Sequence, residues 1–324
     1  MVALSLMIEG QNGLTWDHWK DLVAAAEDLG FAGLFRSDHF TNARPPDKPS
    51  LEMVTSLTYL AARTRRIHFG PLVAPFSFRD PTILARQAAA LDDLSGGRMI
   101  LGVGAGWQER EHTLFGHDLG DIPTRMSRME EGLEVVTRLL KSDDPVTYAG
   151  NYYHLRGATL LPRPSRPGGP PVLIGGNGPR RTLPLVARFA DIWNAVFIGP
   201  DEFRERSAAL DALLGASGRA STSVRRTAMI NLAFARDEDE LARRLSWRER
   251  DADLAALSLD AACDHLLATG RSIAGTADRV VAGIHAFAHA GADELMLQWL
   301  DLDDIAGLEA FATTVMLKFA ESAS

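Results

Sequence analysis

The chain has 324 residues, 46% of them hydrophobic and 23% charged, which is typical of a globular protein that can bury a large core. Its net charge of −8 with scattered basic residues excludes a typical nucleic-acid-binding protein, and its single cysteine, Cys263, excludes a disulfide framework and a cysteine-rich zinc site. Because the sequence has no signal-peptide pattern and no apolar run of about 18 residues, we expect a cytoplasmic protein that makes no membrane contact.

Short apolar runs alternate with helical patterns along the whole chain. The expected strands cover residues 3–9, 33–39, 66–75, 98–106, 170–176, 192–198, 225–235 and 294–300. The expected helices cover residues 16–29, 51–64, 80–95, 127–141, 178–191, 200–214, 237–269, 276–290 and 305–319. Eight strands that alternate with helices favour an α/β fold, a closed (β/α)8 TIM barrel in one domain over residues 1–324, rather than an open doubly wound sheet.

Two stretches exceed what a minimal barrel needs, namely residues 142–169 and 237–269. The first contains YAGNYYHLRG, which is typical of a small hairpin, followed by the proline-rich LPRPSRPGGPP. The second is a polar helical excess. We interpret both as insertions and expect them to determine substrate preference or a dimer contact.

Active sites of such barrels lie at the carboxyl ends of the strands, so the residues that follow each apolar run are the candidates. Asp38 and His39 end the second strand and bring together a carboxylate and an imidazole, the groups that proton transfer near neutral pH requires. Neighbouring strand residues point in opposite directions, so these two side chains need not touch. Alternatively, Asp38 caps a loop or pairs with Arg36, and His39 is structural.

Glycines follow two later strands. In GVGAG (102–106), their lack of a side chain would let a flat ligand approach the backbone closely. In IGGNGPR (174–180), a glycine-rich strand end opens into a helix and could present N–H groups to a phosphate. In either segment, glycine could equally serve only the turn.

The sequence contains neither H-E-x-x-H nor G-x-S-x-G, so it offers no standard zinc-protease or serine-hydrolase motif. Glu109 and His112 are three residues apart and share a helix face, but they are a weak metal pair, and we expect no metal.

Taken together, several segments resemble the bacterial luciferase-like flavin and deazaflavin oxidoreductases over nearly the whole chain. The most specific is the run from Arg79 to Gly116, and the opening IEGQNGLTW with RSDHF is most similar to the probable oxidoreductases that depend on coenzyme F420. The other matching segments are RMSRMEEGLEVVTRLL, YAGNYYHL, PVLIGGNGPRRTLPLVARFADIWN and GTADRVVAGIHAFAHAGADELMLQ.

This resemblance implies a TIM barrel with a tricyclic cofactor at its carboxyl mouth. It implies that His39 and Asp38 are catalytic and that Asp38 also lies near the ring. The strand-three segment, in which related deazaflavin enzymes often have a non-prolyl cis peptide, would support the ring, and two glycine segments would hold the ring edge and the phosphate. The implied cofactor-binding residues are Asp38, Leu72, Val73, Ala74, Gly104, Ala105, Gly106, Trp107, Gly175, Gly176, Asn177 and Gly178.

The resemblance implies coenzyme F420 and a small-molecule substrate. Related sugar-phosphate dehydrogenases carry a catalytic glutamate close behind the strand-four glycines. Here Trp107 follows Gly106 and Glu109 comes two residues later, so we do not expect that activity. One alternative is an FMN-dependent two-component monooxygenase, which would need a flavin reductase as partner. Another is a non-catalytic barrel whose mouth is blocked by Trp107, Phe40 and the inserted residues 148–162. The family also implies a homodimer.

Overall fold

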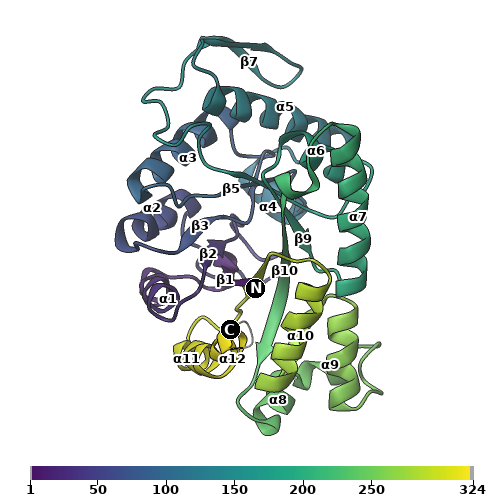
Figure 1. Ribbon diagram of the computed structural model, residues 1–324. Coiled ribbons are helices and arrows are strands. Elements are labelled where there is room, and N and C mark those ends of the chain that lie inside the picture. The colour runs from purple at the N-terminus through teal and green to yellow at the C-terminus, as the bar shows by residue number, and fades with distance from the viewer. Residues whose placement is uncertain (1, 322–324) are drawn as a thin grey trace.

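The computed structural model describes residues 2–321 and shows a parallel β-barrel wrapped by helices (Figure 1). Within these residues ten strands belong to one sheet, which confirms the predicted barrel. These strands are β1 (Ala3–Ile8), β2 (Gly33–Arg36), β3 (His68–Pro71), β4 (Ala74–Pro75), β5 (Leu101–Gly104), β8 (Val172–Gly175), β9 (Ile192–Val196), β10 (Arg225–Phe234), β11 (Ser272–Gly275) and β12 (Glu294–Gln298).

The strand order around the barrel is β3-β2-β1-β12-β10-β9-β8-β5-β4, and every pairing along it is parallel. The remaining seam, between β3 and β5, is bridged where Ile100 N donates to Phe69 O (2.8 Å) and Phe69 N donates to Arg98 O (3.2 Å). The predicted third strand is therefore present as two pieces, β3 and β4.

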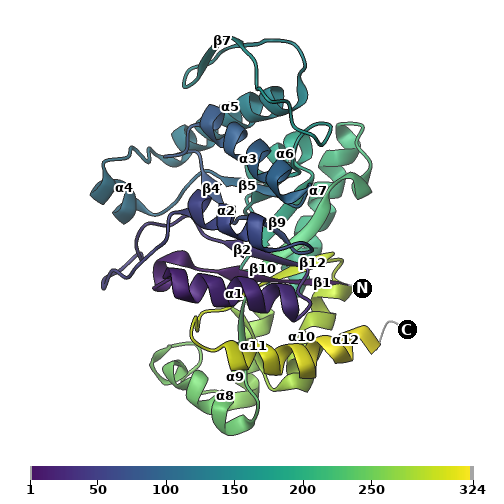
Figure 2. The ribbon, with the colours of Figure 1, turned by 90° about the vertical axis from the view of Figure 1, so that its left-hand side faces the viewer.

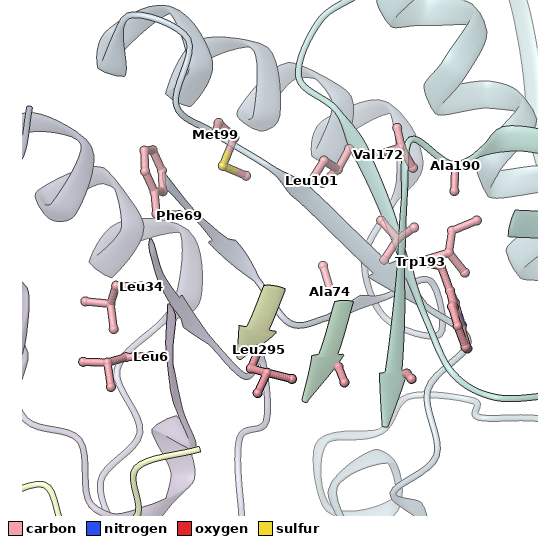
Figure 3. Close-up of a cluster of buried hydrophobic side chains, with 14 of the residues drawn as sticks. Leu6, Leu34, Phe69, Ala74, Met99, Leu101, Val172, Ala190, Trp193 and Leu295 are labelled. Carbon is pink, nitrogen blue, oxygen red and sulfur yellow. The ribbon is translucent and has the colours of Figure 1, made fainter. Parts of the chain in front are cut away.

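Alternating side chains divide the core into two layers, as expected for strands buried on both faces. Met7 belongs to a cluster inside the barrel, with Phe35, Ile100 and Met296. Its neighbour Leu6 belongs to the larger cluster between barrel and helices, part of which is shown in Figure 3.

The helices lie on the outside of the barrel (Figures 1 and 2). Their starts follow ordinary capping chemistry: the Thr15 and Asp80 side chains accept from N–H groups in the first turns of the helices that follow them. The helices are α1 (Trp16–Asp28), α2 (Met53–Arg63), α3 (Pro81–Ser95), α4 (Glu109–Phe115), α5 (Ile122–Lys141), α6 (Thr182–Phe189), α7 (Pro200–Ala216), α8 (Glu238–Arg244), α9 (Leu259–Ala268), α10 (Ala277–His289), α11 (Ile305–Phe311) and α12 (Leu317–Glu321).

The two predicted insertions have ordered structure of their own. The first contains the expected hairpin, β6 (Val146–Ala149) and β7 (His154–Ala158), which extends beyond α5 in Figure 1. The second forms α8 and α9, after which β11 pairs with the far half of β10. The sequence analysis missed β11 because SIAG is too short to show a period. This region has a separate small core that includes the buried thiol of Cys263.

Among residues 2–321, no helix combines the length and the apolar character needed to cross a membrane.

Candidate active site

A cavity of about 530 Å³ opens at the carboxyl ends of the barrel strands. This is the side of the barrel on which α4 lies, opposite the N-terminus in Figure 2. No residue of either insertion lines it. Its lining consists of Glu9, Ser37, Asp38, His39, Leu72, Val73, Pro75, Gly104, Ala105, Gly106, Trp107, Glu111, Gly175, Gly176, Asn194, Val196, Phe197 and Met229.

Asp38 lies in the cavity wall as an ion pair. Its two carboxylate oxygens accept from Arg79 Nε at 2.7 Å and Nη2 at 2.5 Å, and its side chain is almost fully buried. Burial raises the pKa of Asp38, and the hydrogen bonds from Arg79 oppose this rise. The alternative partner, Arg36, instead donates to Ser37 O and Ser56 Oγ. Asp38 therefore anchors its part of the cavity wall through its ion pair with Arg79, which lies 41 positions away in the sequence.

His39 is oriented by Glu111. Its Nδ1 lies 2.9 Å from Glu111 Oε1, and the same carboxylate accepts from Phe40 N at 3.0 Å. Gln108 Nε2 lies 3.1 Å from this Nδ1 and donates to Thr41 O. Burial lowers the pKa of His39, but the hydrogen bond and charge of Glu111 outweigh it, so the pKa is raised overall. With Nδ1 bound to Glu111, Nε2 is the ring nitrogen left without a partner among the residues described.

The strand-three segment forms one wall of the cavity. The Leu72–Val73 peptide is cis, as the family resemblance implied. A Cβ at Gly104 would lie 2.6 Å from Val73 Cγ2, and one at Gly175 would lie 3.2 Å from Val73 Cγ1. Gly104 is required because the Val73 side chain occupies the space in front of it, and a Cβ at Gly175 would also lie tightly against Val73. Close approach of a ligand to the backbone, as the sequence suggested, is therefore not the only reason for glycine here.

Two large aromatic side chains in the lining are exposed. Trp107 is 60% exposed and meets the His39 ring edge to face, with 5.3 Å between ring centroids. Phe197 is 40% exposed and follows β9. The mouth is therefore apolar but open, which argues against a blocked, non-catalytic barrel.

Three predicted cofactor-binding residues do not line the cavity. Ala74 is fully buried in the cluster between barrel and helices (Figure 3). The Asn177 side chain instead joins two strand ends: its Nδ2 donates to Val196 O (2.7 Å) and its Oδ1 accepts from Val196 N (2.9 Å). Gly178 is exposed beyond the rim. The segment from Gly176 onward thus lies at the edge of the cavity.

The structure adds residues to the site beyond the predicted catalytic and cofactor-binding residues. Glu9 directly follows β1 and accepts from Gln11 Nε2 (2.7 Å) and from Gln298 Nε2. Asn194 is fully buried and donates to Thr227 Oγ1, while its Oδ1 has no partner within residues 2–321. Applying the strand-end rule to the first strand would have identified Glu9, whereas no local signal identifies Glu111 as the partner of His39.

Other polar side chains near this end of the barrel do not join the cavity lining. Arg110 pairs with Asp47 at the surface, and Arg180 is exposed. Both ring nitrogens of His112 are engaged, Nδ1 with Gln108 O and Nε2 with Ser77 Oγ, both at 2.7 Å. No group of three or more candidate metal ligands occurs in the described part of the chain.

Comparison with known proteins gives consistent relatives. A family model described as luciferase-like monooxygenase matches residues 4–294. The F420-dependent glucose-6-phosphate dehydrogenase of Amycolatopsis mediterranei is 27% identical over 321 residues, covering 92% of this chain and 94% of that protein. The protein of that name from Kineococcus radiotolerans is 32% identical, covering 68% of this chain and 64% of its own length. Among solved structures, an F420-dependent secondary alcohol dehydrogenase matches with a TM-score of 0.82 and 20% identity, covering 97% of this chain and 98% of its own.

Proposed function

Because the chain belongs to the luciferase-like monooxygenase family, we propose that it is an F420-dependent oxidoreductase that acts on a small organic substrate. The observation that carries the proposal is the pairing of His39 with Glu111 beside a wall built for a flat ring. The relatives described above have F420 in their names, and none of those names refers to FMN.

The cavity fits the deazaflavin. Val73, backed by Gly104 and Gly175, gives an apolar surface on which a planar ring could lie. Asn194 Oδ1 offers a buried acceptor for a ring N–H. When bound, the deazaflavin supplies the carbon that accepts or donates hydride.

The chain itself manages the proton. The Nδ1–H of His39 donates to Glu111, which fixes the imidazole tautomer and directs Nε2 toward the reacting group. His39 Nε2 takes the hydroxyl proton when an alcohol is oxidised and returns it when a carbonyl is reduced. The barrel wall holds the substrate and ring in line for the transfer.

Titration of the purified chain with F420 and with FMN tests the cofactor. Tight binding of F420 with negligible affinity for FMN supports the proposal, and the reverse result would favour the two-component monooxygenase with its flavin reductase. The His39→Ala variant tests the catalytic role, because it should bind F420 normally and lose turnover by about 10²- to 10⁴-fold. Normal turnover of this variant would refute the assigned role.

Three broader expectations belong to the same proposal. Residues 1–324 would form one catalytic domain, the protein would act in the cytoplasm, and two copies would associate as a homodimer. Size-exclusion chromatography with light scattering measures the last of these directly.

A further inference from the structure

Phe197 has a backbone conformation that its side chain disfavours. Its φ is +50°, and among residues 2–321 it is the only residue other than glycine with a positive φ. A bulky residue in this region is strained, and such strain persists where the surrounding structure imposes it, most often at functional positions.

Hydrogen bonds on both sides hold this conformation. Phe197 N donates to Met229 O on β10 at 3.1 Å. The preceding residue, Val196, is clamped by the side chain of Asn177 through both its N–H and its carbonyl. The following turn is packed tightly as well, since a Cβ at Gly270 would lie 2.1 Å from the Ile198 carbonyl carbon. Three separate segments thus force the backbone to present the Phe197 ring at the cavity.

Burial of the Phe197 ring does little to offset this strain. It is 40% exposed while it lines the cavity, although aromatic side chains of this size are usually placed where they bury most of their surface. Trp107 is exposed in the same cavity. Two uncovered aromatic rings provide an apolar surface for a ligand that is held beside the cofactor.

The charged side chains that line the cavity disfavour a negatively charged substrate. Its lining within the described chain contains three carboxylates, Glu9, Asp38 and Glu111, and neither lysine nor arginine. Asp38 is paired with Arg79 and Glu111 with His39, whereas Glu9 accepts, among residues 2–321, from glutamine amides alone. A phosphate or carboxylate on the substrate would find neither a lysine nor an arginine in this lining and would face these negative charges.

We infer that Phe197 is a specificity-determining residue and that the substrate is a neutral alcohol or carbonyl compound with an apolar, ring-bearing body packed against it. The nature of the substrate as an alcohol or carbonyl compound rests on the proposed function. The contact between the ligand and the Phe197 ring does not depend on it. Asn177 is then a positioning residue, which acts by holding Val196 and Phe197 in place.

The test uses acetophenone as a neutral probe and benzoate as an anionic probe of similar shape, with glucose 6-phosphate as a third ligand. Binding to the F420 complex is followed by quenching of protein fluorescence. Acetophenone should bind at least about tenfold more tightly than benzoate or glucose 6-phosphate. Equal or tighter binding of either anion, or no saturable binding of acetophenone, would overturn the inference.

Phe197→Asn is the informative variant, because asparagine tolerates a positive φ but removes the ring. It should weaken acetophenone binding about tenfold, leave the Kd for F420 unchanged, and keep or raise the melting temperature. Phe115→Asn is the matched control, since Phe115 is 55% exposed but does not line the cavity. Unchanged acetophenone binding in Phe197→Asn would refute the role of the ring. A lowered melting temperature would refute the conclusion that the Phe197 backbone is strained.

The test of the Phe197 contact can be separated from the test of the proposed function. If the chain does not bind F420, the same comparison of acetophenone with benzoate is made on the chain without cofactor. The contribution of Phe197 is then still measured, whereas the F420 titration alone decides the cofactor.

Discussion

His39 Nδ1 and Glu111 Oε1 lie 2.9 Å apart although 72 positions separate these residues in the chain. The carboxylate is almost entirely buried, and it accepts from the backbone N–H of Phe40 as well. A buried acceptor held in this way fixes the orientation of the imidazole ring. Glu111, and not solvent, therefore determines that Nε2 is the nitrogen that faces the cavity.

The first prediction concerns Glu111→Gln. The hydrogen bond and charge of Glu111 raise the pKa of His39, so removing this charge should lower that pKa, because burial is then opposed only by the charges of Glu9 and Asp38. The limb of the pH–rate profile that reports His39 should therefore move to lower pH, and kcat should fall by about 10-fold or more. Glu109→Gln, at an exposed position two residues away, should leave the profile unchanged. A profile that does not move in Glu111→Gln would show that the pair does not set the protonation of His39.

The second prediction concerns the ion pair of Arg79 and Asp38. Arg79→Met leaves a buried carboxylate without its partner and should destabilise the fold by about 3–5 kcal/mol in urea unfolding. Adding Asp38→Asn should recover much of this loss, because the uncompensated charge is then removed. Arg110→Met breaks a surface pair with Asp47 and should have no resolvable effect. Equal effects of Arg79→Met and Arg110→Met would contradict the assignment.

The third prediction concerns Gly104. The Cβ of Gly104→Ala would lie 2.6 Å from Val73 Cγ2, so this variant should lose about 1–3 kcal/mol of stability and bind F420 more weakly. Val73→Ala removes the clashing methyl groups, so the double variant should be more stable than additivity predicts. Gly215→Ala is the control, because nothing lies within 4 Å of its Cβ. If the two substitutions at 73 and 104 are additive, the packing described here is not what requires the glycine.

The fourth prediction concerns Cys263. Burial raises the pKa of this thiol, so little reactive thiolate forms at neutral pH. A thiol-specific reagent such as DTNB should label no cysteine in the native protein and one after denaturation, with activity unchanged. Rapid labelling of the native protein with loss of activity would contradict this inert role.

Much of the fold was predictable because local periodicity encodes it. Each predicted strand has a counterpart, and the helix after residue 80 begins where Asp80 and Pro81 indicate. The helix predicted from 127 begins earlier, at Ile122, because Asp121 caps it and a proline follows. No residue of the two insertions lines the cavity, and their expected part in substrate preference or in a dimer contact stays a prediction.

The sequence by itself determined the barrel, the edge at which the cavity opens, and the strand-end residues His39, Gly104 and Gly175. Those features follow from the alternation of short apolar runs with helical patterns and from the rule that strand ends meet at one edge. Only the tertiary structure decided the partners: Glu111 for His39, Arg79 for Asp38, and Val73 for the glycines. It alone revealed the strained backbone of Phe197. Such contacts join segments from different turns of the barrel, and their geometry is set by packing across the chain, which leaves no periodic trace in the sequence.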